Sequence, residues 1–122
     1  MSRAPILFVD DEAINLLNMQ YMLEDTFVVH TARSGERALA LIEEKEVNLL
    51  LTDQKMPGMT GVELARRVRQ RDSDIPILIV TGYVDDDEVN EAKQSGLIQE
   101  IIYKPYSESH ILKTLTRYVS PS

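Results

Sequence analysis

Acidic side chains follow two apolar runs of strand length in this chain. Asp10, Asp11 and Glu12 come directly after one run, and Asp53 follows another. In a parallel sheet, the carboxyl ends of such strands meet at one edge, where ligands bind. Carboxylates this close repel one another, so the pKa of at least one is raised unless a cation lies among them. Oxygen ligands without His or Cys favour Mg²⁺ or Mn²⁺ over zinc, so the pattern predicts a divalent metal site.

A hydroxyl group and an ammonium group are expected at the same edge. Thr81 and Gly82 follow a later apolar run, and Lys104 follows the last one. Lys104 can neutralise charge that develops on a phosphoryl group, and Thr81 can donate a hydrogen bond to a phosphoryl oxygen. Gly82 is small and leaves room for that group to enter. Asp53 is therefore the predicted acceptor of a covalent aspartyl phosphate.

Each of these residues also has a structural interpretation. An Asp at the end of a strand is often only a turn or cap residue, and Lys104-Pro105 could be a plain strand exit. The joint placement of acids, hydroxyl and ammonium at one edge is not required by solvation. It favours phosphoryl transfer assisted by a metal ion.

The elements that position these residues are visible as alternating patterns. Five apolar runs are separated by segments of helical periodicity; the runs cover 6–9, 27–29, 47–51, 75–80 and 98–103. Most runs are nearly continuous, which is typical of strands covered on both faces. The alternation predicts an α/β fold, a doubly wound sandwich with a parallel sheet.

The helical segments show caps and apolar stripes. The first helix is expected over 12–25, with Ile14, Leu17, Tyr21 and Leu23 on its buried face. The third is expected to start at Gly61, to bury Val62, Leu64, Ala65 and Val68, and to turn Arg66, Arg67, Arg69 and Arg71 mostly outward. Predicted N-caps are Ser34, Asp85 (with Glu88 in a capping box) and Ser107, and Gly96 is expected to end the fourth helix.

Composition excludes several classes of protein. The 122 residues include 13 Lys+Arg and 20 Asp+Glu, so 13 − 20 gives a net charge of −7, which disfavours binding to nucleic acid. Without cysteine there is no disulfide framework and no thiolate nucleophile. No apolar stretch approaches the ~20 residues of a membrane span. We expect one cytoplasmic domain over 1–122, with an ordered core over about 5–119 and a possible linker from 120.

These residues, in this order, resemble the receiver domain of two-component response regulators. The resemblance is carried by Asp10-Asp11, the segment from Asp53 to Gly61, Thr81-Gly82 and Lys104-Pro105. It implies a (βα)5 flavodoxin-like sandwich whose five-stranded parallel sheet has the order 2-1-3-4-5.

The resemblance also implies a role for each matching residue. Asp53 corresponds to the phosphoacceptor. Asp11 corresponds to a direct Mg²⁺ ligand and Asp10 to a ligand that acts largely through water, while the backbone carbonyl of Lys55 is a third ligand.

Further positions are implied to act in switching or in tuning of rates. Thr81 is the switch hydroxyl, Lys104 pairs with the phosphate, and the peptide bond before Pro105 is expected to be cis. Ile101 stands where the family usually has an aromatic residue, and Tyr103 lies beside the lysine instead. Glu12, Lys55, Gly82 and Tyr83 complete the positions expected to influence phosphorylation or hydrolysis.

The sequence therefore predicts a signalling switch that accepts a phosphoryl group from a sensor histidine kinase or a phosphotransfer protein. It would catalyse its own phosphorylation and dephosphorylation, without being an enzyme that turns over a substrate. An output domain, a downstream protein or a second copy would recognise the fourth helix, fifth strand and fifth helix. The first helix, which carries Met19 and Met22, contacts the phosphodonor in the family; core filling explains Met22 equally well. No nucleic acid or membrane partner is expected.

Three alternatives stay open. A receiver-like interaction module could lack phosphorylation. A small Mg²⁺-dependent phosphatase with an aspartyl intermediate would need a carboxylate two residues after the nucleophile, where Lys55 stands. A flavin or nucleotide binder would need a Gly/Ser/Thr-rich loop after the first strand, where Asp10, Asp11 and Glu12 stand instead.

Overall fold

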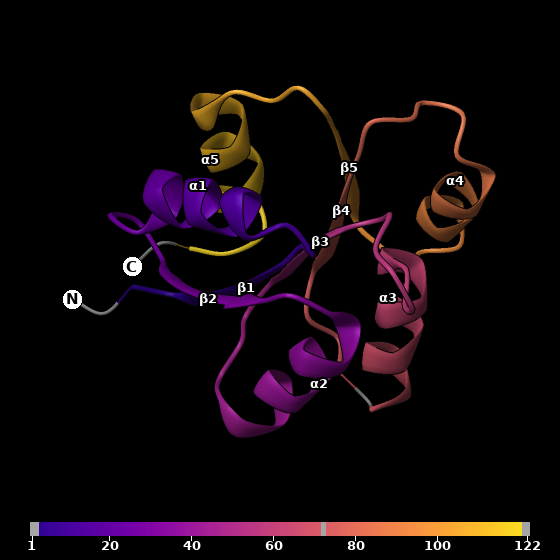
Figure 1. Cartoon of the computed structure of the whole chain (residues 1–122), viewed down its shortest axis with the longest axis horizontal. Coiled ribbons are helices and arrows are strands. Elements are labelled where there is room, and N and C mark those ends of the chain that lie inside the picture. Colours follow the sequence, from indigo (N-terminus) through magenta and orange to yellow (C-terminus); the bar gives the residue numbers. More distant parts are fainter. Residues whose placement is uncertain (1–2, 72, 121–122) are drawn as a thin grey trace.

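The chain folds as a five-stranded parallel sheet with helices on both faces. A computed structural model describes residues 3–71 and 73–120 and gives the strand order β2-β1-β3-β4-β5 (Figure 1). The strands are β1 (Pro5–Val9), β2 (Val28–Ala32), β3 (Leu50–Asp53), β4 (Ile77–Thr81) and β5 (Glu100–Tyr103). The helices are α1 (Ala13–Leu23), α2 (Gly35–Glu44), α3 (Gly61–Gln70), α4 (Asp87–Gln94) and α5 (Glu108–Thr116). The α/β class and the predicted strand order are confirmed.

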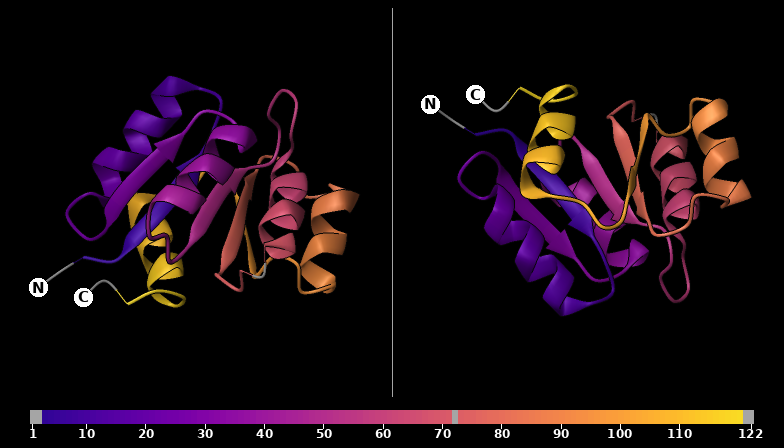
Figure 2. Two further views of the ribbon diagram at one scale, coloured as in Figure 1. Left: turned by 90° about the horizontal axis from the view of Figure 1, so that it is seen from below. Right: turned by 90° about the horizontal axis from the view of Figure 1, so that it is seen from above.

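The sheet separates two hydrophobic layers. Helices α1 and α5 cover one face, while α2, α3 and α4 cover the other (Figures 1 and 2). Central strands contribute to both layers, so that on β1 Phe8 packs on the α1/α5 side and Leu7 and Val9 pack on the opposite side. This explains the nearly continuous apolar runs. None of the described helices is long and apolar enough to cross a membrane.

The strand positions differ from the apolar runs by a few residues. The second run ends at Val29, yet β2 continues through His30 and Thr31 to Ala32. This strand lies at the edge of the sheet, where polar side chains reach solvent at little cost. On β3 the ladder begins at Leu50, although burial already begins at Leu49. Hydrophobicity therefore marks burial more closely than it marks strand pairing.

The buried face of α1 is not the one predicted. Its core residues are Leu16, Met19 and Leu23, and only the last of these was assigned correctly. Ile14, Leu17 and Tyr21 are instead 58%, 63% and 79% exposed. The prediction failed because the helix carries two apolar stripes with the same spacing of three and four residues. Met22 packs partly against the α1/α5 layer, so both methionines serve the core.

Most predicted helix ends are confirmed. The side chains of Ser34 and Ser107 accept hydrogen bonds from the third residue of their helices, and Gly96 follows α4 with a φ of +83°. The fourth helix is capped by Asp86, not Asp85, because the Asp86 carboxylate accepts the hydrogen bond from the backbone N–H of Val89. Asp85 to Asp87 form an unbroken acidic run, so the sequence did not distinguish them.

We predicted that Arg69 points outward from the third helix, but its side chain is bonded to the protein. Its guanidinium donates to the carbonyl oxygens of Ser73, Ile75 and Leu97 and to the side chain of Gln99. These bonds tie α3 to the segments that enter β4 and β5. Arg66, Arg67 and Arg71 are exposed, as predicted.

Gly61 allows α3 to start directly against the end of β3. A Cβ atom at this position would lie 2.6 Å from the backbone oxygen of Asp53, which is too close for any side chain. At Gly82, by contrast, an added Cβ would meet nothing within 4 Å. The atom that a Cβ at Gly61 would meet first belongs to the backbone of Asp53, so a change of side-chain rotamer cannot relieve this contact.

We expect Gly61→Ala to destabilise the fold by about 1–3 kcal/mol, the usual cost of overpacking a close contact. Gly82→Ala is the matched control and should change stability by less than about 0.5 kcal/mol. Urea unfolding followed by circular dichroism measures both. Equal stability of the two variants would show that the loop between β3 and α3 relaxes freely.

Candidate functional site

Asp53 lies at the centre of the carboxyl edge of the sheet, at the end of β3. Its side chain is nearly buried, and its Oδ1 atom lies 3.0 Å from Nζ of Lys104, which follows β5. The strand between them, β4, brings Thr81 to the same edge, and the backbone N–H of Lys104 donates to the carbonyl oxygen of Thr81. Three neighbouring strands thus place an acid, a hydroxyl and an ammonium group together, as predicted.

Three carboxylates form a cluster at this edge. Asp10, Asp11 and Asp53 each offer an oxygen within 4.8 Å of the others. Both oxygens of Asp10 already accept hydrogen bonds, one from the backbone N–H of Glu12 at 2.9 Å and one from the amide of Asn15 at 3.1 Å. Among the residues described, none donates a hydrogen bond to the Asp11 carboxylate. Asp11 is therefore the carboxylate best placed to bind a cation directly.

The surroundings of Asp53 raise its pKa. Burial is the largest cause, and it is partly offset by the hydrogen bond and the charge of Lys104. The negative charges of Asp10 and Asp11 raise the pKa of Asp53 further. Burial lowers the pKa of Lys104, but its ion pair with Asp53 outweighs this and leaves that pKa raised. The site favours an added positive charge.

A small cavity opens in front of Asp53. Its volume is about 330 Å³, and it is lined by Asp53, Lys55, Thr81, Gly82, Tyr83 and Lys104. The Thr81 hydroxyl is buried and accepts a hydrogen bond from the backbone N–H of Tyr83 at 3.2 Å. At the rim, Nζ of Lys55 lies 4.2 Å from the centre of the Tyr83 ring, a cation–π distance. The cavity is large enough for a phosphoryl group and its waters.

The remaining predicted positions are not among the residues that line this cavity. Ile101 packs against the layer of α2, α3 and α4, whereas Tyr103 is 40% exposed. The Lys104–Pro105 peptide bond is cis, as the resemblance implies. Glu12 is exposed, and its contact with Asp10 is made through its backbone N–H.

Gln54 is a contact residue that the sequence did not reveal. Its side chain is buried directly after Asp53, where its Oε1 accepts from the backbone N–H of Val62 at 2.9 Å and its Nε2 donates to Glu88 at 2.6 Å. These bonds join β3 to the first turns of α3 and α4. The only sequence signal was a polar residue between Asp53 and the predicted loop, which is equally typical of a solvated turn.

Comparisons with known proteins agree with this geometry. The sequence model of the response regulator receiver domain matches residues 6–116. Chemotaxis protein CheY of Pseudomonas aeruginosa is 35% identical over 112 residues, covering 88% of this chain and 89% of that protein. The structure of chemotaxis protein CheY4 of Vibrio cholerae superposes with a TM-score of 0.89 at 30% identity, covering 97% of this chain and 100% of that chain.

Longer proteins contain similar domains. The hydrogenase transcriptional regulatory protein HoxA of Cupriavidus necator is 33% identical over 117 residues, which are 96% of this chain but 24% of that protein. The shared region therefore occurs both as most of a protein and as one part of a larger regulator. With the family model matching most of the sequence and the strand order of the sheet confirmed, the chain belongs to the response regulator receiver domain family.

Proposed function

We propose that Asp53 accepts a phosphoryl group from a phosphohistidine on a sensor kinase or phosphotransfer protein. The observation that carries this proposal is the ion pair between Asp53 and Lys104 beside two further carboxylates. An oxygen of the Asp53 carboxylate attacks phosphorus, the phosphorus–nitrogen bond breaks, and the histidine leaves with the electron pair. Attack by water later releases inorganic phosphate and restores the carboxylate.

The residues around Asp53 fit a magnesium ion. The three carboxylates supply only oxygen donors, which is the chemistry that Mg²⁺ prefers. Asp11 would bind directly, Asp10 would act largely through water, and the backbone carbonyl of Lys55 would complete the protein's share of the ligands. When bound, the ion supplies positive charge that offsets the repulsion between the carboxylates and the phosphoryl oxygens.

Lys104 and Thr81 recognise the transferred group. The ammonium group of Lys104, now paired with Asp53, would donate to a phosphoryl oxygen once Asp53 has become an acyl phosphate and its carboxylate charge is lost. The Thr81 hydroxyl lines the same cavity and would donate to another phosphoryl oxygen. Both changes alter contacts at β4 and β5, so we place the surface read by an output domain or a second copy at α4, β5 and α5.

A phosphatase function is less well supported. Such an enzyme needs a carboxylate near the nucleophile to protonate the leaving group. The expected position holds Lys55, whose ammonium group lies over the Tyr83 ring. The function as a switch therefore accounts for more of the site.

We propose that the phosphodonor docks on the exposed stripe of α1 formed by Ile14, Leu17 and Tyr21. Exposed apolar side chains gathered at helical spacing mark interaction surfaces. The stripe follows directly after the acidic residues at the end of β1, so a partner seated on it would reach Asp53. The relevant face of α1 is thus the apolar stripe, in place of the buried Met19.

Incubation with Mg²⁺ and a small acyl phosphate should add one phosphoryl group per chain, detected as intact mass. Asp53→Asn removes the nucleophile, so it should abolish the adduct, and a chelator should do the same to the unaltered protein. Arg67→Gln, at an exposed position of α3 outside the cavity lining, is the control and should still be labelled. If a control receiver is labelled under these conditions and this chain is not, the protein is a phosphorylation-silent interaction module.

In metal-free buffer, we expect Asp53→Asn to raise Tm at pH 7.5 by about 3–6 °C, a shift equivalent to ~1 kcal/mol in a domain of this size. The pKa of Asp53 is raised in the folded state, mainly by burial. The native state therefore holds this proton more tightly than the unfolded state does, and ionisation costs stability as pH rises through the raised pKa. The gain should shrink toward zero as pH falls below the ordinary aspartate pKa of about 3.9, because the carboxyl is then protonated in both the folded and the unfolded state. A gain independent of pH would contradict this origin.

Leu17→Glu should slow phosphotransfer from a phosphohistidine protein at least tenfold, because it places a charge in the apolar stripe. Labelling by the small acyl phosphate should be unchanged, since that donor needs no docking surface. Gln20→Glu is the matched control: it adds the same charge at another exposed position of α1. Equal loss in both variants would indicate a charge effect and not a docking site.

A further inference from the structure

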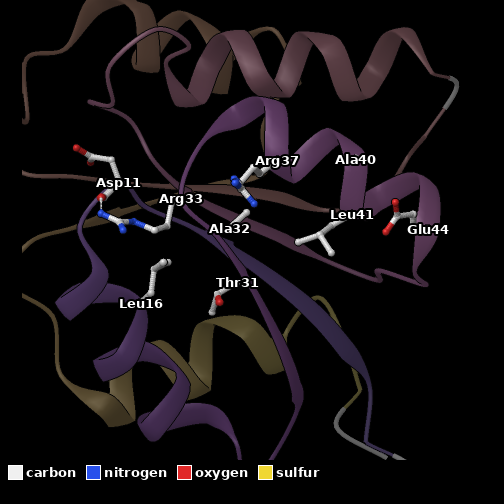
Figure 3. A pocket seen from close by; sticks show the side chains of 9 residues that line it. All are labelled: Asp11, Leu16, Thr31, Ala32, Arg33, Arg37, Ala40, Leu41 and Glu44. Atoms are coloured by element: carbon white, nitrogen blue, oxygen red, sulfur yellow. Dashed lines mark hydrogen bonds between the residues drawn. The ribbon is translucent and has the colours of Figure 1, made fainter.

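The open edge of β2 lies in a groove between α1 and α2. The cavity there has a volume of about 860 Å³ and is lined by residues of both helices and of the strand (Figure 3). Thr31 and Ala32 form its floor, and Leu16 and Leu41 contribute apolar walls from α1 and α2. Of the residues that line the cavity, Asp11 is the one that also belongs to the carboxylate cluster, so the groove requires an account of its own.

The backbone of β2 offers unused hydrogen-bonding groups to this groove. The backbone N–H of Val28 donates to the carbonyl of Ala4, and the carbonyl of Ala32 accepts from Asp10. In a parallel ladder, alternate residues face the same neighbour, so Val29 and Thr31 direct their backbone N–H and C=O groups away from β1. Among residues 3–71 and 73–120, no further strand pairs with β2 beyond β1. An edge of this kind is a template for an added strand.

Two arginines stand at one end of the groove. The guanidinium of Arg33 donates one hydrogen bond, to the backbone carbonyl of Asp11 at 3.2 Å, and has further N–H groups to offer. Within residues 3–71 and 73–120, the guanidinium of Arg37 has no hydrogen bond or ion pair. In a chain of net charge −7, this pair is a local site of positive charge.

The carboxylates of Asp11 and Glu44 also line the cavity, and their positions determine how charge is distributed along it. Glu44 ends α2 and lies at the opposite end of the groove from the arginines (Figure 3). The carboxylate of Asp11 is turned away from the guanidinium of Arg33, which is bonded to the backbone of Asp11 instead (Figure 3). The groove is therefore polarised along β2, with its positive end beside Arg33 and its negative end beside Glu44.

We propose that this groove binds an extended acidic peptide segment of a partner protein, added as a strand beside β2 with its carboxylates on Arg33 and Arg37. An extended segment can satisfy the open N–H and C=O groups, whereas a helix uses its own backbone groups internally. Carboxylates match guanidinium groups in planar pairs. A nucleic acid, with its many phosphates, would be repelled by the overall charge. The proposal does not depend on phosphorylation of Asp53.

The test uses the full chain, labelled with ¹⁵N, and the synthetic peptide Lys-Thr-Val-Thr-Val-Asp-Asp. The lysine of the peptide would pair with Glu44, and its two aspartates would pair with Arg33 and Arg37. We expect amide shifts concentrated in residues 29–33, with affinity at least fivefold weaker for the peptide that ends in Asn-Asn. The double variant Arg33→Gln/Arg37→Gln should bind the acidic peptide at least fivefold more weakly than the unaltered chain. The matched control Arg66→Gln/Arg67→Gln, on exposed positions of α3, should bind it with unchanged affinity.

A backbone variant separates strand addition from simple charge attraction. Thr31→Pro removes an N–H group that faces the groove and leaves the ladder to β1 intact, so it should abolish binding; Thr31→Val keeps the backbone and should bind normally. If Thr31→Pro does not fold, as its own amide spectrum will show, the comparison of acidic and amide peptides decides. Absence of shifts at millimolar peptide, shifts outside residues 29–33, or equal affinity for both peptides overturns the proposal.

Discussion

The ion pair between Lys104 and Asp53 is the interaction on which the active edge depends. A parallel sheet ends all its strands at one side, and in this chain that geometry gathers three carboxylates within 4.8 Å. Without a cation, such a cluster would leave a buried charge opposed by its neighbours. Lys104 reaches Asp53 at 3.0 Å from the end of β5, so a contact across β4 partly offsets the burial and repulsion of the Asp53 charge.

Gln54 and Lys55, which follow Asp53, connect the active edge to elements outside the sheet. Gln54 donates to Glu88 on α4, and Lys55 stacks on Tyr83 in the loop that leads to α4. Asp53, Gln54 and Lys55 thus contact the residue that follows β5, helix α4 and the loop before α4. A change of charge at Asp53 alters the strongest of these contacts directly. The other two connect the loop after β3 to α4 and to the loop before α4.

The fold and the acidic site could be predicted because they follow from local patterns. Apolar runs mark buried strands, and the residues at their ends share an edge whatever the details of packing. The face of α1 could not be predicted, because Ile14-Leu17-Tyr21 and Leu16-Met19-Leu23 have the same spacing, and only the position of the sheet decides between them. Gln54 and Arg33 act through partners 34 and 22 positions away, and no local pattern encodes such contacts.

The exposed stripe on α1, formed by Ile14, Leu17 and Tyr21, is the second of the two apolar stripes on this helix. A helix that packs on a sheet needs only one apolar face, and Leu16, Met19 and Leu23 supply it. The second stripe adds nothing to the core, while leaving Tyr21 79% exposed to water. Scattered apolar residues on a surface need no explanation, but three on one face of a helix next to the acidic loop do. Packing in the fold does not account for these three side chains, and this is why we assign the stripe to docking of the phosphodonor.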